Sequence, residues 1–140
     1  MHYQIQKTET SERPSFKDMQ LAFSGRFGRS SSLTDERIIA ICDGITDILA
    51  VCFSVSSRDL RSRDRIHASI CRVRQIGIYV THVSLGLNMT EVAKGFGRDR
   101  STIVHSCHLI EDLRDEVEFD RIVGVVERIA QAAFGKNAGE

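Results

Sequence analysis

Residues 95–113 read GFGRDRSTIVHSCHLIEDL, and they contain the end of one predicted helix and the start of the next. Gly97 stands where the C-terminus of a helix favours a left-handed residue. Asp99 follows at the position of an N-cap, whose side chain can satisfy free amides at the start of a helix. Apolar residues then recur at helical spacing and predict a buried stripe made of Ile103, Cys107, Ile110, Leu113 and Val117. These signals predict that one helix ends near Gly97 and that another begins almost at once.

A short helix is predicted just before this turn, in the segment NMTEVAKGF. Asn88 or Thr90 can cap it. Its buried side is expected to consist of Met89, Val92, Ala93 and Phe96. A short capped helix, a tight glycine turn and a second amphipathic helix together predict a helix-turn-helix.

Helical spacing also appears upstream, in the segment LTDERIIAICDGITDILAVCFS. Thr34 or Asp35 can cap a helix there. The apolar residues at helical spacing are Ile38, Ile41, Ile45, Ile48, Leu49 and Cys52. In the following VSSRDLRSRDR, Ser56 or Ser57 is expected to cap a short turn that Leu60 anchors.

Two further helices are predicted. One starts at Ile66 or Ile70 and runs to Val83, and the other covers residues 119–134. The apolar spacing of the last helix runs through Ile122, Val126, Ile129 and Ala133. Because no segment alternates apolar and polar residues as a half-buried strand does, the predicted fold class is all-α, a helical bundle containing the helix-turn-helix.

The chain of 140 residues has the size of one domain. Residues 1–32 show no periodicity and predict a disordered N-terminal tail. The helix-turn-helix domain is expected to span 33–134, with a short tail at 135–140. No uncharged run is long enough to cross a membrane, and the N-terminus lacks the apolar core of a signal peptide, so we expect a cytoplasmic protein. The cysteines form no CxxC pair and are expected to be reduced core residues: Cys42, Cys52, Cys71 and Cys107.

The net charge of zero hides an asymmetry along the chain. Residues 58–105 hold nine basic against four acidic side chains, whereas residues 106–140 hold four against eight. Fifteen of the nineteen basic residues are arginine, whose guanidinium suits bidentate contacts to phosphates and base edges. This pattern is typical of an anion-binding face, although a solvated surface with internal salt bridges would look the same.

Polar residues gather at the start of the second helix of the motif. In a helix-turn-helix this end meets base edges in the major groove of DNA. Arginine can read guanine, aspartate can accept from the amino group of cytosine, and a threonine methyl can pack on thymine. The candidate DNA-binding residues here are Arg98, Asp99, Arg100, Ser101, Thr102 and His105. Arg98 could instead cap the preceding helix or pair with Asp99.

From about Arg37 to Ile129 the chain resembles the C-terminal DNA-binding domain of the bacterial replication initiator DnaA. SSRDLRSRDRIHASICRVRQIGIYV is similar to the family's basic stretch, which ends in an arginine–glutamine pair that Arg74 and Gln75 match. LNMTEVAKGFG resembles the family's first motif helix. RDRSTIVHSCHLIEDL resembles its signature RDHTTVLHAxxKIxxL.

The resemblance implies a role for each matching residue. Arg74 would match an arginine that reaches into the minor groove. Asp99, Ser101 and Thr102 would match contacts in the major groove and to phosphates. Four arginines of the basic stretch would line the DNA backbone, and these are Arg58, Arg61, Arg63 and Arg65. The implied partner is double-stranded DNA in the bacterial nucleoid.

Two departures from the family pattern alter these expectations. The family usually reads FGGRDHTT, whereas this chain reads FGRDRST, so the turn is one residue shorter and Arg100 replaces a histidine. Guanine could therefore be preferred at that position. The chain also lacks a GxxxxGK[ST] phosphate loop, and we expect no ATPase module and no nucleotide. The prediction is a stand-alone reader of DnaA-box-like sites that regulates transcription or modulates replication.

Other functions are less favoured by the sequence. His105 and His108 flank Cys107, but Cys107 falls on the buried stripe and no fourth ligand is evident, so we expect no metal. An enzyme is disfavoured because no nucleophile–base pair and no glycine-rich cofactor loop occur, and no cofactor is expected. The main alternative is a protein-interaction module that uses the acidic C-terminal helices, with only non-specific DNA binding. A homodimer or a protein partner stays open.

Overall fold

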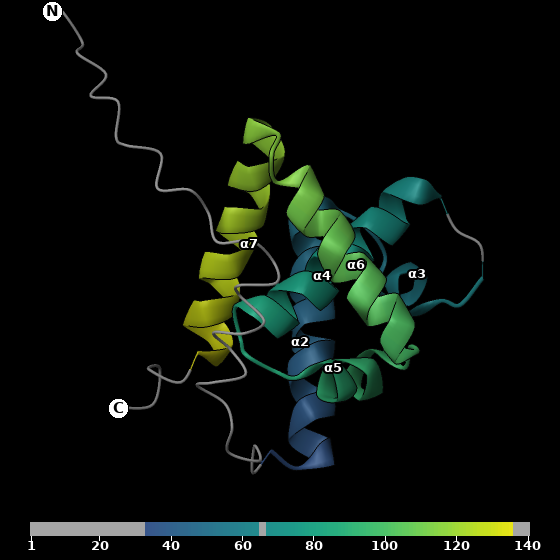
Figure 1. The fold of residues 1–140 in the computed structure, drawn as a ribbon. Coiled ribbons are helices and arrows are strands. Elements are labelled where there is room, and N and C mark those ends of the chain that lie inside the picture. Colours follow the sequence, from purple (N-terminus) through teal and green to yellow (C-terminus); the bar gives the residue numbers. More distant parts are fainter. Residues whose placement is uncertain (1–32, 65–66, 136–140) are drawn as a thin grey trace, which may run out of the picture.

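The computed structural model describes residues 33–64 and 67–135. The predicted N-terminal tail lies outside this part, as do Arg65 and all but the first residue of the predicted C-terminal tail. The described residues form helices and no strand, which confirms the all-α fold (Figure 1). The helices are α2 (Asp35–Phe53), α3 (Ser57–Arg61), α4 (Ala68–Val83), α5 (Met89–Phe96), α6 (Arg100–Leu113) and α7 (Val117–Phe134).

Helix α4 is the centre of the bundle. It packs against α2, α6 and α7, and α2 also packs against α5. Every residue from Ile76 to Val83 is consequently buried, and the Tyr79 side chain is fully enclosed. Figure 1 shows α7 on one side of the bundle and α3 on the other, with α6 crossing between them in the view. No helix of the described part is long and apolar enough to cross a membrane.

The helix starts follow the capping residues of the sequence. The Thr34 side chain accepts from the Arg37 amide at the start of α2, and Ser56 accepts from the Asp59 amide at the start of α3. Leu60 is buried, as predicted. These local hydrogen bonds satisfy backbone amides that the first turn of a helix leaves free.

Two glycines allow helices to approach each other closely. A Cβ on Gly77 in α4 would lie 2.5 Å from Cδ1 of Leu49 in α2. A Cβ on Gly95 in α5 would lie 2.2 Å from Sγ and 2.9 Å from Cβ of Cys42 in α2. Both distances are shorter than non-bonded carbon or sulfur contacts allow. The close approach of α2 to α4 and to α5 therefore requires glycine at these two positions.

The predicted buried face of the last helix is wrong by one position. Val126 is buried as expected, but its buried neighbours are Val123 and Ala130. Ile122 and Ile129 are exposed, and so is Ala133. The reason is that α7 carries two adjacent apolar stripes, and its packing against α4 selects the less bulky one. Val117 is also not part of the α6 stripe: α6 ends at Leu113, and Val117 begins α7 with 78% of its surface exposed.

The cysteine prediction is right for two of the four residues. Cys42 and Cys107 are buried, and burial raises the pKa of each thiol to about 12. Cys52 is exposed because it lies beyond the buried stripe of α2, near the end of that helix, and Cys71 is half-buried.

A polar network ties the C-terminal end of α6 to α4 and α7. Arg114 donates to Asp120 and Glu127, each at 2.6 Å, and only 12% of its side chain is exposed. The Ser84 hydroxyl donates to Glu127 at 2.5 Å, and the Gln131 amide donates to the Ser84 carbonyl. These contacts lie at the far end of α6 from the helix-turn-helix turn.

Candidate nucleic-acid interface

Helix α5 begins with a capping box. Oδ1 of Asn88 accepts from the Glu91 amide at 2.8 Å, and Oε1 of Glu91 accepts from the Asn88 amide at 2.9 Å. Two free donors are thus satisfied reciprocally. Met89 and Val92 are buried, while Ala93 and Phe96 are half-buried against the core. The sequence therefore identified both the cap and the buried side of this helix.

The turn of the motif is formed by Gly97. Its φ of 63° and ψ of 39° are left-handed, as predicted, and the Arg98 amide bonds back to the Ala93 carbonyl at 3.0 Å. These bonds satisfy carbonyls at the end of α5. Because α6 starts at Arg100, only three residues separate the two helices.

The start of α6 presents polar side chains to solvent. Asp99 occupies the N-cap position with an extended backbone, but its side chain makes no capping hydrogen bond. Ile103 and Cys107 are fully buried behind it. The remaining predicted readers of this helix are exposed, and these are Arg100, Ser101, Thr102 and His105. The structure thus confirms their outward position, while their contact with DNA stays a prediction.

Asp99 and Arg100 have side chains that bond to nothing else in the described part of the chain. Neither makes a hydrogen bond or an ion pair with another described residue. A charged side chain without an internal partner is available for an external ligand. This distinguishes them from Arg61, Arg63 and Arg74, which bond to other described residues.

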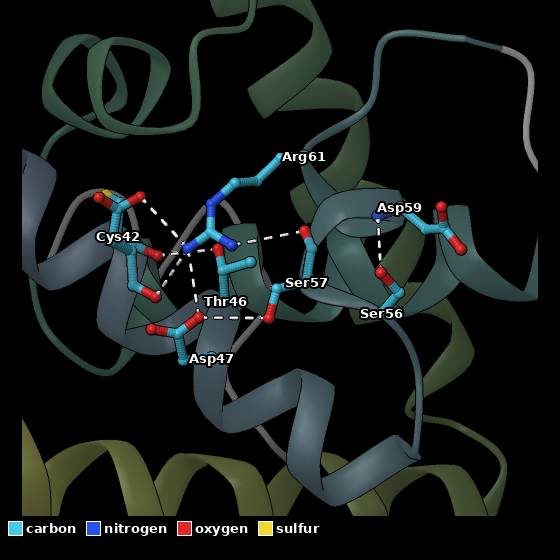
Figure 2. A network of polar contacts seen from close by, with 8 residues as sticks. Cys42, Thr46, Asp47, Ser56, Ser57, Asp59 and Arg61 are labelled. Atoms are coloured by element: carbon cyan, nitrogen blue, oxygen red, sulfur yellow. Dashed lines mark hydrogen bonds and ion pairs between the residues drawn. The ribbon is translucent and has the colours of Figure 1, made fainter.

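Arg61 is turned toward α2. Figure 2 shows its guanidinium beside Asp47 and Ser57. Nη2 lies 3.5 Å from Oδ1 of Asp43 and 3.3 Å from Oδ1 of Asp47, and Nη1 donates to the Ser57 carbonyl at 3.4 Å. Two carboxylates therefore offset its charge.

Arg74 is directed at the end of α3. Nε donates to the Leu60 carbonyl at 2.7 Å, and Nη2 donates to the carbonyls of Ser62 at 3.0 Å and Asp59 at 3.3 Å. Its guanidinium satisfies carbonyls that the end of a helix leaves free. Its neighbour Gln75 accepts from Arg72 at 3.0 Å. No local sequence pattern indicates this capping role of Arg74, because Leu60 lies 14 positions earlier in the chain.

Arg63 and Arg98 are also engaged with the backbone. Nη2 of Arg63 donates to the Gly97 carbonyl, and Nη2 of Arg98 donates to the Ser62 carbonyl, each at 2.7 Å. Burial, and then the positive charges of Arg74 and Arg63, lower the pKa of Arg98. Arg98 therefore neither pairs with Asp99 nor points freely outward. Arg58 is exposed on α3 and makes no polar contact with another described residue.

A groove of about 350 Å³ lies beside these arginines. Its wall combines the cations Arg61, Arg63, Arg74 and Lys94 with apolar side chains such as Ile39 and Phe96. The sequence did not predict this groove, since its walls come from separate elements of the chain. Arg61 and Lys94 are paired with aspartates there, Lys94 with Asp35 at 2.5 Å.

The three residues considered for a metal do not converge. Cys107 is buried in the core, whereas His105 and His108 are exposed on the other side of α6. Among residues 33–64 and 67–135, no group of three or more potential ligands could hold a metal ion.

A short capped helix, a left-handed glycine turn and a second helix with an exposed polar N-terminus define a helix-turn-helix. Residues 42–110 match the family described as the bacterial dnaA protein helix-turn-helix. This chain therefore carries a DNA-binding helix-turn-helix domain of the bacterial DnaA family.

Two chromosomal replication initiator proteins DnaA are similar to this chain. The protein of Desulfotalea psychrophila is 37% identical over 68 residues, which cover 49% of this chain and 14% of that protein. The protein of Trichormus variabilis is 34% identical over 87 residues, which cover 61% of this chain and 18% of that protein. The similarity is thus confined to a small part of each initiator.

Proposed function

We propose that this protein recognises a DnaA-box-like site in double-stranded DNA and thereby regulates transcription or modulates replication initiation. The observation that carries the proposal is the exposed polar N-terminus of α6, placed directly after the tight turn at Gly97. In a helix-turn-helix, this end of the second helix enters the major groove.

The proposed base readers are the exposed residues of α6. Arg100 can donate two hydrogen bonds to guanine, and the Thr102 methyl can pack against thymine. Ser101 and the free amides at the helix start can bind a phosphate. Arg100 is the best single probe, because its side chain is exposed and makes no hydrogen bond or ion pair with another described residue that its removal would break.

We also propose that residues 1–140 act as a regulator without hydrolysing ATP. The sequence contains no GxxxxGK[ST] loop, which is the motif that cradles nucleotide phosphates in such ATPases. The matching DnaA family is the helix-turn-helix and not the ATPase module. We therefore infer that residues 1–140 act by occupying their binding sites on DNA.

The alternative function, docking through the acidic C-terminal helices, has less support. Glu111 accepts a hydrogen bond from Tyr79, and Asp120 accepts one from Arg114. Two of the carboxylates that would attract a basic partner are thus used inside the bundle.

Selection from a random duplex library tests the proposal, with the wild type and Arg100→Ala in parallel. We expect the wild type to enrich a DnaA-box-like motif and the variant to relax one position of it. Loss of a good base contact costs about 1–3 kcal/mol of discrimination. Enrichment of no motif by the wild type at moderate salt would overturn the proposal. Weak binding with a steep salt dependence would then indicate phosphate contacts alone.

A further inference from the structure

Two hydrogen bonds join the loop after α3 to the turn of the helix-turn-helix in a reciprocal way. Arg63 donates to the Gly97 carbonyl, and Arg98 donates to the Ser62 carbonyl, both at 2.7 Å. Each arginine directly follows the residue whose carbonyl the other arginine binds. We call these four residues the arginine clamp: Ser62, Arg63, Gly97 and Arg98.

The clamp is anchored to α4 as well. The Ser62 carbonyl accepts from both Arg98 and Arg74, and Arg74 also binds the Leu60 carbonyl. A carbonyl oxygen has two lone pairs, so both donors can be satisfied at once. The end of α3 is therefore fixed to the central helix and to the helix-turn-helix turn by the same set of guanidinium groups.

These arginines are used for backbone carbonyls and not for carboxylates. Within the described part of the chain, Arg63, Arg74 and Arg98 make no ion pair. Their mutual proximity is unfavourable, and it contributes to the lowered pKa of Arg98. Nε of Arg98 is in addition buried without a hydrogen-bond partner among the described residues. Charge-assisted bonds to carbonyls are strong enough to hold such an arrangement.

We propose that Arg63 and Arg98 are positioning residues for DNA recognition, which hold the loop and the start of α6 at a fixed spacing. Arg98 stands only two residues before Arg100. A movement of the Gly97 carbonyl would therefore shift the exposed end of α6 relative to the loop after α3. Small displacements of this kind are enough to weaken a recognition site. This inference rests on the proposed function and adds the residues that set its selectivity.

A positioning residue and a phosphate contact give different results when they are replaced. Loss of a phosphate contact weakens binding to all sequences equally and reduces the salt dependence, by about 0.9 in the log–log slope. Loss of a positioning residue weakens binding to the selected site more than to random DNA and leaves the salt slope almost unchanged.

Arg63→Gln is the test variant, and Arg58→Gln is its matched control because it removes the same charge from the same basic stretch. Both are compared with the wild type on the selected duplex and on a scrambled duplex, across a series of salt concentrations. For Arg63→Gln we expect the ratio of specific to non-specific affinity to fall about tenfold. For Arg58→Gln we expect an unchanged ratio and a smaller salt slope.

If Arg63→Gln behaves like Arg58→Gln, Arg63 is a phosphate contact and the inference is overturned. If the wild type selects no sequence, the proposed function fails and the inference fails with it. The two failures are thus distinguishable on the same samples.

Amide hydrogen exchange of the free protein tests the clamp without DNA. The reporters are the Arg98 amide, bonded to the Ala93 carbonyl, and the Ile103 amide, bonded to the Asp99 carbonyl. We expect faster exchange at both amides in Arg63→Gln, with exchange in α2 unchanged. Arg63→Gln and Arg98→Gln should also be non-additive in selectivity, because either one opens the clamp. Unchanged exchange at both reporters would overturn the inference.

Discussion

The hydroxyl of Tyr79 donates a hydrogen bond of 2.6 Å to Oε2 of Glu111 and so joins the buried centre of α4 to α6. Nη1 of Arg114 donates to the same hydroxyl at 3.2 Å, and its guanidinium lies 5.6 Å from the centre of the Tyr79 ring. Burial raises the pKa of Tyr79, and the hydrogen bond to Glu111 raises it further. The phenol is therefore neutral and acts as a donor.

Tyr79→Phe tests this link. The variant keeps the ring and its packing but removes both hydrogen bonds of the hydroxyl, so we expect the free energy of unfolding to fall by about 1–3 kcal/mol. Urea unfolding measures it. The exposed end of α6 is remote from Tyr79, so affinity for the selected duplex should be unchanged under conditions where the variant is folded. A stability equal to that of the wild type would show that the hydrogen bonds contribute nothing net.

The parts of this fold that the sequence predicts are those governed by local chemistry. Asn88 and Gly97 mark the ends of α5 because capping and left-handed backbone depend on a few neighbouring residues. The exposed end of α6 follows from the same signals together with the stripe through Ile103. These features position the candidate site, and they were expected without knowledge of the tertiary structure.

The arginine clamp and the face of α7 depend on tertiary contacts. Arg63 and Gly97 are 34 positions apart, and no local pattern distinguishes an arginine that binds a carbonyl from one that faces a phosphate. In α7, stripes through Ile122 and through Val123 are both compatible with a helical repeat. Only the packing partner decides between them, and α4 lies against the second.

Gly95→Ala should destabilise the bundle, whereas Gly124→Ala should not. The added Cβ at Gly95 would lie 2.2 Å from Sγ of Cys42, but at Gly124 in α7 it would meet no atom within 4 Å. Overpacking of a core costs about 1–3 kcal/mol. In an open helical position, alanine is favoured over glycine by about 1 kcal/mol. The midpoint temperature of thermal unfolding should therefore decrease for Gly95→Ala and increase for Gly124→Ala. A shift in the same direction for both variants would contradict the close approach of α2 and α5.

Because the ring of His82 is buried, we expect the stability of the fold to depend on pH. Nδ1 of this ring donates to the Leu87 carbonyl at 2.7 Å, and burial lowers the pKa of His82 below the ordinary value of 6.5. As the pH falls through 6.5, the unfolded chain binds a proton before the folded protein does. The free energy of unfolding is therefore greatest above this pH, decreases below it, and levels off once the pH passes the lowered pKa.

Urea unfolding at pH 7.5 and pH 5.5 measures this effect, with these two values chosen to be about one unit either side of the ordinary histidine pKa. The loss between these two pH values is expected to be at most about 1.4 kcal/mol, the free energy of one pKa unit, because pH 5.5 lies only about one unit below the pKa of the unfolded chain. His82→Gln should remove this part of the loss. His105→Gln, at an exposed position of α6, is the control and should lose as much unfolding free energy at pH 5.5 as the wild type does. Equal pH dependence in the wild type and His82→Gln would assign the loss to other groups.

The thiols should react at widely different rates. Cys52 is exposed, while Cys42 and Cys107 are buried with pKa values raised to about 12. Because the thiolate is the nucleophile, a disulfide reagent at neutral pH should label Cys52 quickly and the two buried thiols only on unfolding. Cys52→Ser should abolish the fast phase. Rapid labelling of Cys107 in the native protein would show that the apolar side of α6 is accessible to the reagent and not buried in the core.

Arg61 should contribute less to DNA attraction than Arg58, although both belong to the same short helix. Arg61 is flanked by Asp43 and Asp47, which offset its charge, whereas Arg58 has no acidic partner among the described residues. Arg58→Gln is expected to reduce the salt slope of binding by about 0.9. Arg61→Gln should reduce it much less and should lower stability by no more than about 1 kcal/mol, since these ion pairs are partly exposed. Equal slopes for the two variants would mean that Arg61 leaves its aspartates when DNA binds.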